Sequence, residues 1–442
     1  MFRATLTLAL GTSLVLTPFA IQALELTAAA ELGAEYRTNS RRSSFDDESD
    51  IILTPGINGR ATHEGPNLRL DAQYDIKHRY FKEDFEDDET ILTGYGNLQW
   101  SALPERLDVR VTQTNNENTR QSFDRGTQSD RQIITSTEAS PTLKFRVRRA
   151  DELQLQYTYT YTDSEDDDID NERQVVTGRY IYAYSPSTTI SLAASFGDTA
   201  YDLDGVPDVD STSYTLTFDS AGQSSQLSLM GGYSLYERRG EPDADGPVWN
   251  LEWSTQTSAQ TTFSFGTERE ITDRSEELLD IDTQRYNDIN YENTDLTDVF
   301  ESTSAFISVT QPFGATSVDA RLSWDEADYE RVPRDETQIE LSASATRQLR
   351  RQLEANVQFS FANVEYEGFD ADYDQYTLET SVLWDVNRRF EAEGGVFYVK
   401  REGSVISGDY DDLGFFVTAR YFFSGDNTAA DRRARPSRAS RY

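Results

Sequence analysis

Residues 412–423 read D-L-G-F-F-V-T-A-R-Y-F-F, and this stretch decides the fold class. Its odd-numbered positions, from Leu413 to Phe423, are apolar and uncharged, whereas its even-numbered positions include Gly414 and Arg420. Strict alternation over this length predicts a β-strand whose two faces meet different environments. A tilted strand of about ten residues can cross a bilayer. Two interpretations remain open at this point, a membrane-spanning strand and a half-buried strand of a soluble β-sandwich.

Six residues of the same stretch form a pattern of a glycine, alternating apolar residues and closing aromatic residues. They are Gly414, Phe415, Val417, Ala419, Tyr421 and Phe423. The pattern resembles the terminal strand by which outer-membrane β-barrel proteins are recognised for insertion, and it implies the barrel-assembly machinery as a partner. One departure is that a polar tail follows Phe423.

The composition favours one large barrel over two or three soluble domains. The 442 residues include 24 Tyr and 23 Phe but no Cys, and the mean hydropathy is −0.66. Membrane barrels commonly have a hydrophilic average, because only alternate residues of each strand meet lipid. The formal net charge of −37 argues against nucleic acid as a partner, since phosphates require a basic surface.

Both ends of the chain differ from the repeating pattern between them. Residues 1–23 are predicted to be a secretory signal peptide, with Arg3 before a mostly apolar run and Ala23 at the cleavage position. No Cys follows, which excludes a lipoprotein anchor. No other apolar run approaches the roughly 18 residues of a membrane helix. Residues 425–442 are predicted to be a basic, disordered periplasmic tail, so the barrel is expected to span residues 24–424.

Alternating runs like the terminal one recur along the whole mature chain. In residues 67–81, the even-numbered positions from Leu68 to Ile76 are apolar, whereas the odd-numbered positions from Arg69 to Lys77 are polar. About 20 such runs follow one another, and an even number is what single-chain bacterial barrels require.

Two features depart from the regular strand pattern. The runs at residues 211–218 and 248–255 are weak, and about 18 strands would remain if both failed. Pro55 and Pro141 fall inside strand runs, where proline removes a ladder donor, and local bulges are expected at both.

The connections between the runs alternate between short turns and long loops. Residues 65–67 and 185–187 fit tight hairpins, whereas the longest loop is expected at residues 272–297. The long loops carry acidic clusters such as residues 165–168, and the short turns carry arginines such as Arg148. This asymmetry predicts an all-β protein: a single transmembrane antiparallel β-barrel of about 20 strands in the bacterial outer membrane, with short periplasmic turns and long acidic extracellular loops.

Further features carry a resemblance to a known family. They are the stretch Gly33-Ala34-Glu35-Tyr36-Arg37-Thr38-Asn39, the tyrosine-rich strands, turns such as Tyr184-Ser185-Pro186-Ser187-Thr188, and the terminal strand. Through these features most of the mature chain resembles the β-barrel porin-2 type of outer-membrane protein, which is often associated with exopolysaccharide or capsule loci. The resemblance implies a porin-like barrel that serves export or assembly of a surface polysaccharide. It also implies polysaccharide export components as partners, and it carries over no catalytic residue.

Charged residues on the polar faces of the runs are the best functional lead. They are Arg69, Asp71, Asp75, Lys77, Asp108, Arg110, Asp319, Arg321, Glu354, Glu391, Glu393 and Arg420. Because charges on the lipid face are costly, these residues are predicted to line the lumen. A barrel of about 16 or more strands encloses an aqueous channel unless something blocks it.

Two segments bear on whether such a channel is blocked. The first run begins close to the predicted cleavage site, which leaves no room for an N-terminal plug and argues against a TonB-dependent transporter. The loop at residues 272–297 is predicted either to fold inward as a constriction or to lie over the mouth.

Catalytic and metal-binding chemistry have weak support in the sequence. The only histidines are His63 and His78, and acidic residues near His78 are expected anywhere in so acidic a chain. Acidic stretches such as residues 163–170 offer oxygen ligands for Ca²⁺, but none has the complete spacing of a calcium loop. Solvated, self-repelling loops are therefore the favoured interpretation, and we expect no enzyme, no metal and no cofactor.

Two functions of different class remain open. The leading one is a passive or partner-gated conduit in contact with outer-membrane lipid and lipopolysaccharide. The other is a structural or surface-interaction barrel with a closed lumen. Matched charges that cross the lumen would favour the closed barrel, whereas an open lumen with unpaired charge or aromatic tracks would favour the conduit.

Overall fold

The structure is a computed structural model, and it describes most of the predicted barrel. The described residues are 24–42, 48–83, 86–119, 131–164, 170–202, 207–238, 243–257, 260–273, 299–329, 335–368, 370–404 and 408–423. The predicted signal peptide, the basic tail and residues 274–297 of the longest loop lie outside these ranges. The acidic residues 165–168 lie outside them as well.

The described residues form twenty β-strands, and none of them forms a helix that is long and apolar enough to span a membrane. The strands are β1 (Glu25–Arg37), β2 (Asp50–Glu64), β3 (Leu68–Phe81), β4 (Glu89–Leu103), β5 (Leu107–Thr119), β6 (Arg131–Arg146), β7 (Asp151–Ser164), β8 (Asn171–Ser185), β9 (Thr188–Tyr201), β10 (Val209–Ala221), β11 (Ser225–Arg238), β12 (Ala244–Gln256), β13 (Thr262–Asp273), β14 (Val299–Phe313), β15 (Thr316–Tyr329), β16 (Asp335–Arg350), β17 (Leu353–Glu367), β18 (Tyr373–Asp385), β19 (Phe390–Gly403) and β20 (Tyr410–Phe422).

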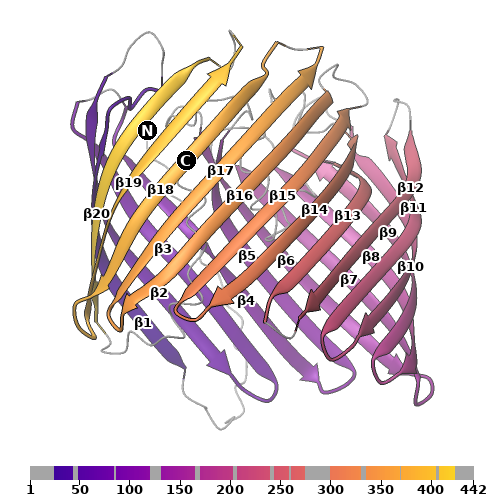
Figure 1. Cartoon of the computed structure of the whole chain (residues 1–442). Helices are drawn as coiled ribbons and strands as arrows, with labels where there is room; N and C mark the ends of the chain where they lie inside the picture. The colour runs from indigo at the N-terminus through magenta and orange to yellow at the C-terminus, as the bar shows by residue number, and fades with distance from the viewer. Residues whose placement is uncertain are drawn as a thin grey trace.

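The strands close into a single antiparallel barrel (Figure 1). Each strand pairs with its neighbour in sequence, and β1 pairs with β20 to complete the ring. The predicted fold class is therefore confirmed, including the strand number. The two weak runs form β10 and β12 and pair along nearly their full lengths with β11 between them.

The two faces of the wall differ in the way that the alternating pattern predicts. Outward side chains are apolar and exposed, as for Val417 at 61%, Leu192 at 59% and Leu216 at 55%. Inward side chains are mostly polar and often buried, as for Thr162 at 0% and Thr418 at 6%. A wall with an apolar exterior and a polar interior suits a barrel surrounded by lipid and filled with polar groups or water.

The connections are short at one end of the barrel and longer at the other. Short connections range from residues 186–187, between β8 and β9, to residues 257–261, between β12 and β13. The connections at the opposite end include residues 38–49 and 274–298. The alternation predicted from the sequence is confirmed, and it gives the barrel a short-turn end and a long-loop end.

The predicted bulges at Pro55 and Pro141 are wrong. Pro55 lies opposite Leu32 of β1, and the register of β2 with β3 is the same on both sides of the proline. Pro141 likewise lies opposite Val109 of β5, and the register of β6 with β7 continues past it. Proline lacks one donor, which faces a single neighbouring strand, so only the local pairing on that side is interrupted.

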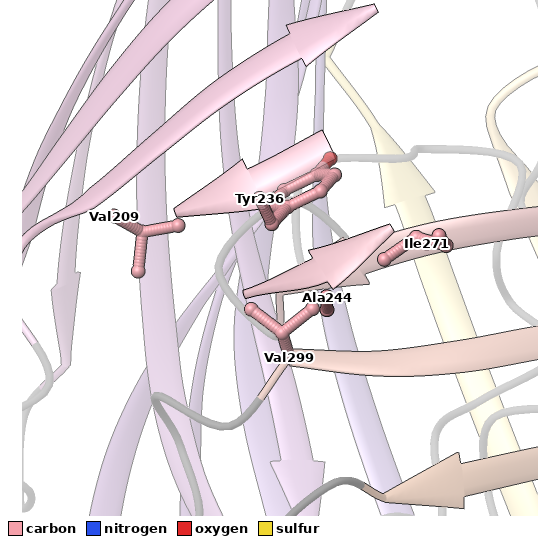
Figure 2. Close-up of a cluster of buried hydrophobic side chains, with 5 residues drawn as sticks. All are labelled: Val209, Tyr236, Ala244, Ile271 and Val299. Carbon is pink, nitrogen blue, oxygen red and sulfur yellow. The ribbon is translucent and has the colours of Figure 1, made fainter. Parts of the chain in front are cut away.

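Apolar packing on the inside of the wall is found at the long-loop end. Figure 2 shows Val209, Tyr236, Ala244, Ile271 and Val299, which come from five consecutive strands, β10 to β14, and are each at most 6% exposed. Such a cluster beside the loops anchors the strand ends where ladder pairing stops.

Candidate functional site: the inner wall of the barrel

The inner wall is the surface that carries the polar chemistry of the molecule. Strand alternation and register place all twelve residues predicted to line the lumen on this wall. Arg69, Asp71, Asp75 and Lys77 alternate with outward Leu68 on β3, for example, and Glu391 lies opposite Arg420. Whether the wall surrounds an open pore stays a prediction at this point.

An ion-pair chain crosses the strand pair at which the barrel closes. Arg420 of β20 contacts Glu31 of β1 on one side, and on the other its Nη1 lies 3.1 Å from Oε1 of Glu391 on β19. Lys77 of β3 extends the chain, with its Nζ 3.9 Å from Oε1 of Glu31. The side chains of Glu31 and Glu391 are only 8% and 2% exposed, so the pairing offsets a large desolvation cost.

A glycine makes room for the contact between Lys77 and Glu31, which is the longest in this series of ion pairs. Gly56 of β2 lies between Glu31 and Lys77 in the strand register. A Cβ atom at Gly56 would lie 3.1 Å from Cγ of Lys77 and 2.9 Å from the backbone oxygen of Ile76. The lysine side chain therefore passes over Gly56 to reach a carboxylate two strands away.

Two other predicted residues of β3 have partners on β2. Nη2 of Arg60 lies 3.2 Å from Oδ1 of Asp71, and Nδ2 of Asn58 donates to Oδ1 of Asp75 at 2.7 Å. The hydroxyl of Tyr95 on β4 also donates to Oδ2 of Asp71, at 3.4 Å. Both carboxylates are thus held against the wall by neighbouring strands.

Three further predicted residues are engaged elsewhere on the wall. Asp108 accepts a hydrogen bond from Ser101 at 2.7 Å, and its Oδ2 lies 2.6 Å from Nζ of Lys144. Thr310 donates to Asp319 at 2.7 Å. The guanidinium of Arg321 lies over the ring of Phe306, 3.8 Å from the ring centroid.

The remaining predicted lumen residues differ in burial and partners. Glu393 is 3% exposed. The side chains of Arg69, Arg110 and Glu354 form no hydrogen bond or ion pair with any residue in the described ranges. The structure therefore assembles some of the predicted residues into ion pairs and leaves others available on the wall.

The sequence interpretation missed a partly buried charge cluster at the long-loop end. Nη1 of Arg79 lies 2.5 Å from Oε1 of Glu117 and 2.9 Å from Oε1 of Glu89, and Nη1 of Arg131 lies 3.2 Å from Oε1 of Glu117. The four residues come from β3, β4, β5 and β6. All four were visible as charges near run ends, but alternation alone gives no register and so could not pair them.

A second missed cluster lies beside the connection from β1 to β2. The backbone N–H of Asn39 donates to Oδ1 of Asp412 at 3.1 Å, and Nη1 of Arg37 lies 3.9 Å from Oδ2 of the same carboxylate. Arg401 lies over the rings of Tyr373 and Tyr410, at 4.1 and 5.5 Å from their centroids. These contacts hold the start of this connection against the inner wall at the long-loop end.

The predicted insertion residues divide between the two faces of β20. Exposed fractions are 49% for Phe415, 61% for Val417, 42% for Tyr421 and 57% for Phe423, all on the outer face. Ala419 shares that face, whereas Gly414 faces inward beneath the ring of Phe397. The rings of Tyr421 and Phe423 meet edge to face, with centroids 5.7 Å apart.

The histidines and acidic groups give no support to catalysis or metal binding. His78 is hydrogen bonded through Nδ1 to Thr90 at 2.9 Å, and alternation places Asp75 on the opposite face of the strand. Within the described ranges, no three His, Asp or Glu side chains gather closely enough to hold a metal ion. The absence of enzymatic activity stays a prediction.

Five cations of the described inner wall pair with carboxylates around its circumference. Arg60, Lys77, Arg79, Lys144 and Arg420 each contact carboxylates that are one or two strands away. Barrels of about 16 to 18 strands already enclose an aqueous channel, and this barrel has twenty strands. The pairs of these five cations therefore lie around the wall and not across the lumen.

Comparison with known proteins agrees with this architecture. The family model described as "Putative beta-barrel porin 2" matches residues 336–422, which cover β16 to β20. The resemblance to this family is therefore confirmed, and its association with capsule loci is not tested by the match. No curated protein matches the sequence.

Solved structures show the same kind of barrel at low sequence identity. The ferric citrate transporter FecA in its unliganded form is similar with a TM-score of 0.50 and 10% identity, over 91% of this chain and 79% of that one. The siderophore receptor PirA from Pseudomonas aeruginosa gives 0.49 and 10% identity, over 91% and 81%. OccAB4 from Acinetobacter baumannii gives 0.41 and 10%, over 91% and 99%. The likeness to FecA shows the fold alone, which is that of an outer-membrane β-barrel.

Proposed function

We propose that the protein is a conduit for hydrophilic solutes across the bacterial outer membrane. The observation that carries this proposal is that Lys77, Lys144 and Arg420, within the described residues, pair along the inner wall and not across it. Paired wall charges leave a wide polar lumen between them, whereas a closed barrel needs pairs or packing that bridge opposite walls. The apolar outer face suits contact with lipid and lipopolysaccharide.

The solute we propose is a surface polysaccharide in export or assembly. The support is the resemblance to the porin-2 family together with an inner wall rich in hydroxyl, amide and charged groups. Such groups form hydrogen bonds with a hydrated glycan without requiring a specific pocket. Export components on the periplasmic side would be the partners, and the outward residues of β20 would serve recognition by the barrel-assembly machinery. The proposal includes no catalytic step.

A planar-bilayer recording of the purified, refolded protein tests the conduit. Steady, large conductance steps are expected from a barrel whose folded state has been verified by its unfolding transition. Deleting residues 274–297 then tells whether the longest loop narrows the path, since a wider path gives larger steps. A folded barrel that stays silent, with and without this deletion, would contradict the proposal.

One observation favours a second function, a structural barrel with a closed lumen. Inward side chains of β18 to β20 are almost fully covered: Phe397 is 0% exposed, Glu391 1%, Glu379 3% and Phe416 3%. A wall covered to this extent over three strands is what a filled lumen would produce. Silence in the bilayer would move the assignment to this function.

A further inference from the structure

Three arginines on the inner wall stand apart from its other cations. Arg69, Arg110 and Arg179 are exposed, and none of their side chains forms a hydrogen bond, ion pair or ring contact with a described residue. By contrast, Arg60 and Lys144 of the same wall each contact a carboxylate. Acidic residues outnumber basic ones by 78 to 41 in this chain, so unpaired arginines are not explained by a shortage of carboxylates.

The three arginines lie on β3, β5 and β8, and their distance from the short-turn end increases in that order. Arg69 is the second residue of β3, Arg110 is the fourth of β5, and Arg179 lies six residues before the end of β8 at Ser185. Each lies further from the short turns than the one before it. We call Arg69, Arg110 and Arg179 the arginine arc.

The spacing within the arc allows several anionic groups to be bound at the same time. Arg69 and Arg110 lie opposite the two sides of Gln99, so they are two strands apart in one row. Neighbouring strands are about 4.8 Å apart, which separates the two arginine backbones by about 10 Å. A chain of repeated anionic groups can contact each arginine in turn, whereas a single carboxylate or phosphate would require both side chains to converge on it.

Neutral hydrogen-bonding side chains lie beside all three arginines. Three carboxylates also lie beside two of them without forming an ion pair with them: Glu64 opposite Arg69, Asp71 two residues after Arg69, and Asp108 two residues before Arg110. Gln99 lies between Arg69 and Arg110, and Gln154 lies opposite Arg179 on β7. Guanidinium groups bind carboxylate, phosphate and sulfate through paired N–H donors, and amides add contacts to hydroxyl groups. The combination suits a ligand that has both anionic groups and hydroxyl groups.

The opposite wall is acidic. In a closed ring of twenty strands, β5 faces β15 and β8 faces β18, and Figure 1 shows the strands from β14 to β18 on the near wall with β3 to β6 behind them. Asp319 and Glu354 lie on β15 and β17, and Oε1 of Glu379 on β18 is buried without a hydrogen-bond partner among the described residues. An anionic ligand in the lumen would thus be attracted to the arc and repelled from the wall that faces it.

We propose that the arginine arc is a binding track for the anionic groups of an acidic polysaccharide that enters from the short-turn end. The chemistry is carboxylate, phosphate or sulfate recognition by guanidinium groups, repeated along a polymer. The proposal deepens the proposed conduit function and rests on it for the direction of transport, but binding to the arc can be measured without transport.

Calorimetric titration of the folded, detergent-solubilised protein tests binding. The probes are oligogalacturonate as an acidic oligosaccharide, dextran of the same length as a neutral one, and citrate as a small anion. We expect oligogalacturonate to bind and dextran not to bind. The triple variant Arg69→Gln, Arg110→Gln and Arg179→Gln should weaken oligogalacturonate binding by about tenfold or more, because it removes three charge-assisted contacts.

A second triple variant supplies a matched control. Arg351→Gln, Arg388→Gln and Arg389→Gln remove the same charge from exposed positions in the short turns, outside the lumen. In single-channel recordings these changes should lower the rate at which oligogalacturonate blocks the channel. The reason is that arginines at the channel entrance attract the anion over a long range and so raise its association rate. The same changes should leave the residence time of each block unchanged, whereas the arc variant should shorten it by about tenfold.

The possible outcomes separate the proposals. Equal oligogalacturonate affinity for the wild type and the arc variant overturns the binding track, even when the channel conducts. Binding that depends on the arc in a barrel that never conducts keeps the track and overturns the conduit. Arc-dependent binding of citrate but not of oligogalacturonate shows an anion site for small solutes and overturns the polysaccharide assignment.

Discussion

Glycines on the inner wall receive side chains from neighbouring strands. The ring of Phe397 lies over Gly414, and the ring of Phe416 lies over Gly395 on the adjacent strand. The space above a glycine lets an aromatic ring lie flat against the sheet, which increases contact between strands that side-chain alternation would otherwise separate. Gly414, which the sequence marks as the start of the insertion pattern, thus also has a packing role.

Replacing Gly414 with alanine should destabilise the barrel by about 1–3 kcal/mol. The new methyl group would overlap the ring of Phe397, which is fully buried and has no free space to move into. Urea unfolding in detergent micelles measures the change. Combining Gly414→Ala with Phe397→Ala should cost less than the sum of the two single changes. Gly178→Ala is the control, because a Cβ at Gly178 would meet no atom within 4 Å. Strict additivity would contradict the packing role.

Replacing Arg420 with glutamine should be more costly, by about 3–5 kcal/mol. The change leaves Glu31 and Glu391 buried without their shared cation. Unfolding midpoints in urea measure the loss, and the added change Glu391→Gln should restore part of it. Lys400→Gln is the control, since Lys400 and Glu402 form a pair with side chains 43% and 55% exposed, for which little effect is expected. Equal effects of the two single changes would argue against the ion-pair chain.

At the scale of elements, the sequence defines which face each residue occupies but not which residue it meets. Side chains along β20 alternate between the two faces, so the sequence of β20 alone predicts that Arg420 lies on the polar face. Its partner Glu31 is almost the whole chain away, and a pattern of period two fits any register shifted by two residues. The prolines show the same limit, because the effect of Pro55 depends on which neighbouring strand its missing donor faces.

Cross-linking tests the register at which the barrel closes. Ala34 of β1 lies directly opposite Val417 of β20, with both side chains on the outer face. Directly opposed residues have Cα atoms about 4.5–5.5 Å apart, within the range of a disulfide. The chain has no Cys, so Ala34→Cys with Val417→Cys should cross-link on oxidation without competing pairs. The cross-link is read as a change in gel mobility that reductant reverses. Moving the second cysteine to Phe416 should abolish it, because that side chain faces inward.

Charge tolerance tests the assignment of the two faces on a single strand. Leu216→Arg, in the middle of β10, places a charge on the outer face, where Leu216 is 55% exposed. In a lipid bilayer this change should cost about 2–4 kcal/mol. Thr215→Arg, one residue earlier on the inner face, should cost much less, because its charge can reach the polar lumen. Equilibrium unfolding from lipid vesicles compares the two variants. A larger cost for Thr215→Arg would reverse the two faces.

At the scale of the whole molecule, the sequence predicts a barrel, its strand number and the asymmetry of its ends. It does not predict how the lumen charges are arranged, because that depends on where each strand lies around the ring. The arginine arc illustrates this limit. Arg69 and Arg110 are recognisable as inward charges, but Arg179 joins them only when β8 is placed near β5. Glu64 lies opposite Arg69 in the register, so the lack of a carboxylate partner for all three side chains among the described residues emerges only from the side-chain positions.

The balance of charge predicts the ion selectivity of the channel. The acidic excess of the chain, at −37, should make the channel prefer cations at low salt. The preference should fall between about 0.1 M and 1 M KCl, because the Debye length shortens from about 10 Å to about 3 Å. Reversal potentials under a salt gradient measure the permeability ratio. Glu354→Gln should reduce the cation preference, whereas the triple arginine-arc variant should increase it. Opposite shifts in cation preference from Glu354→Gln and from the arginine-arc variant are expected only if the acidic wall and the arginine arc face the same ion path. If both shifts were absent in a conducting channel, ions would follow a route that neither wall lines.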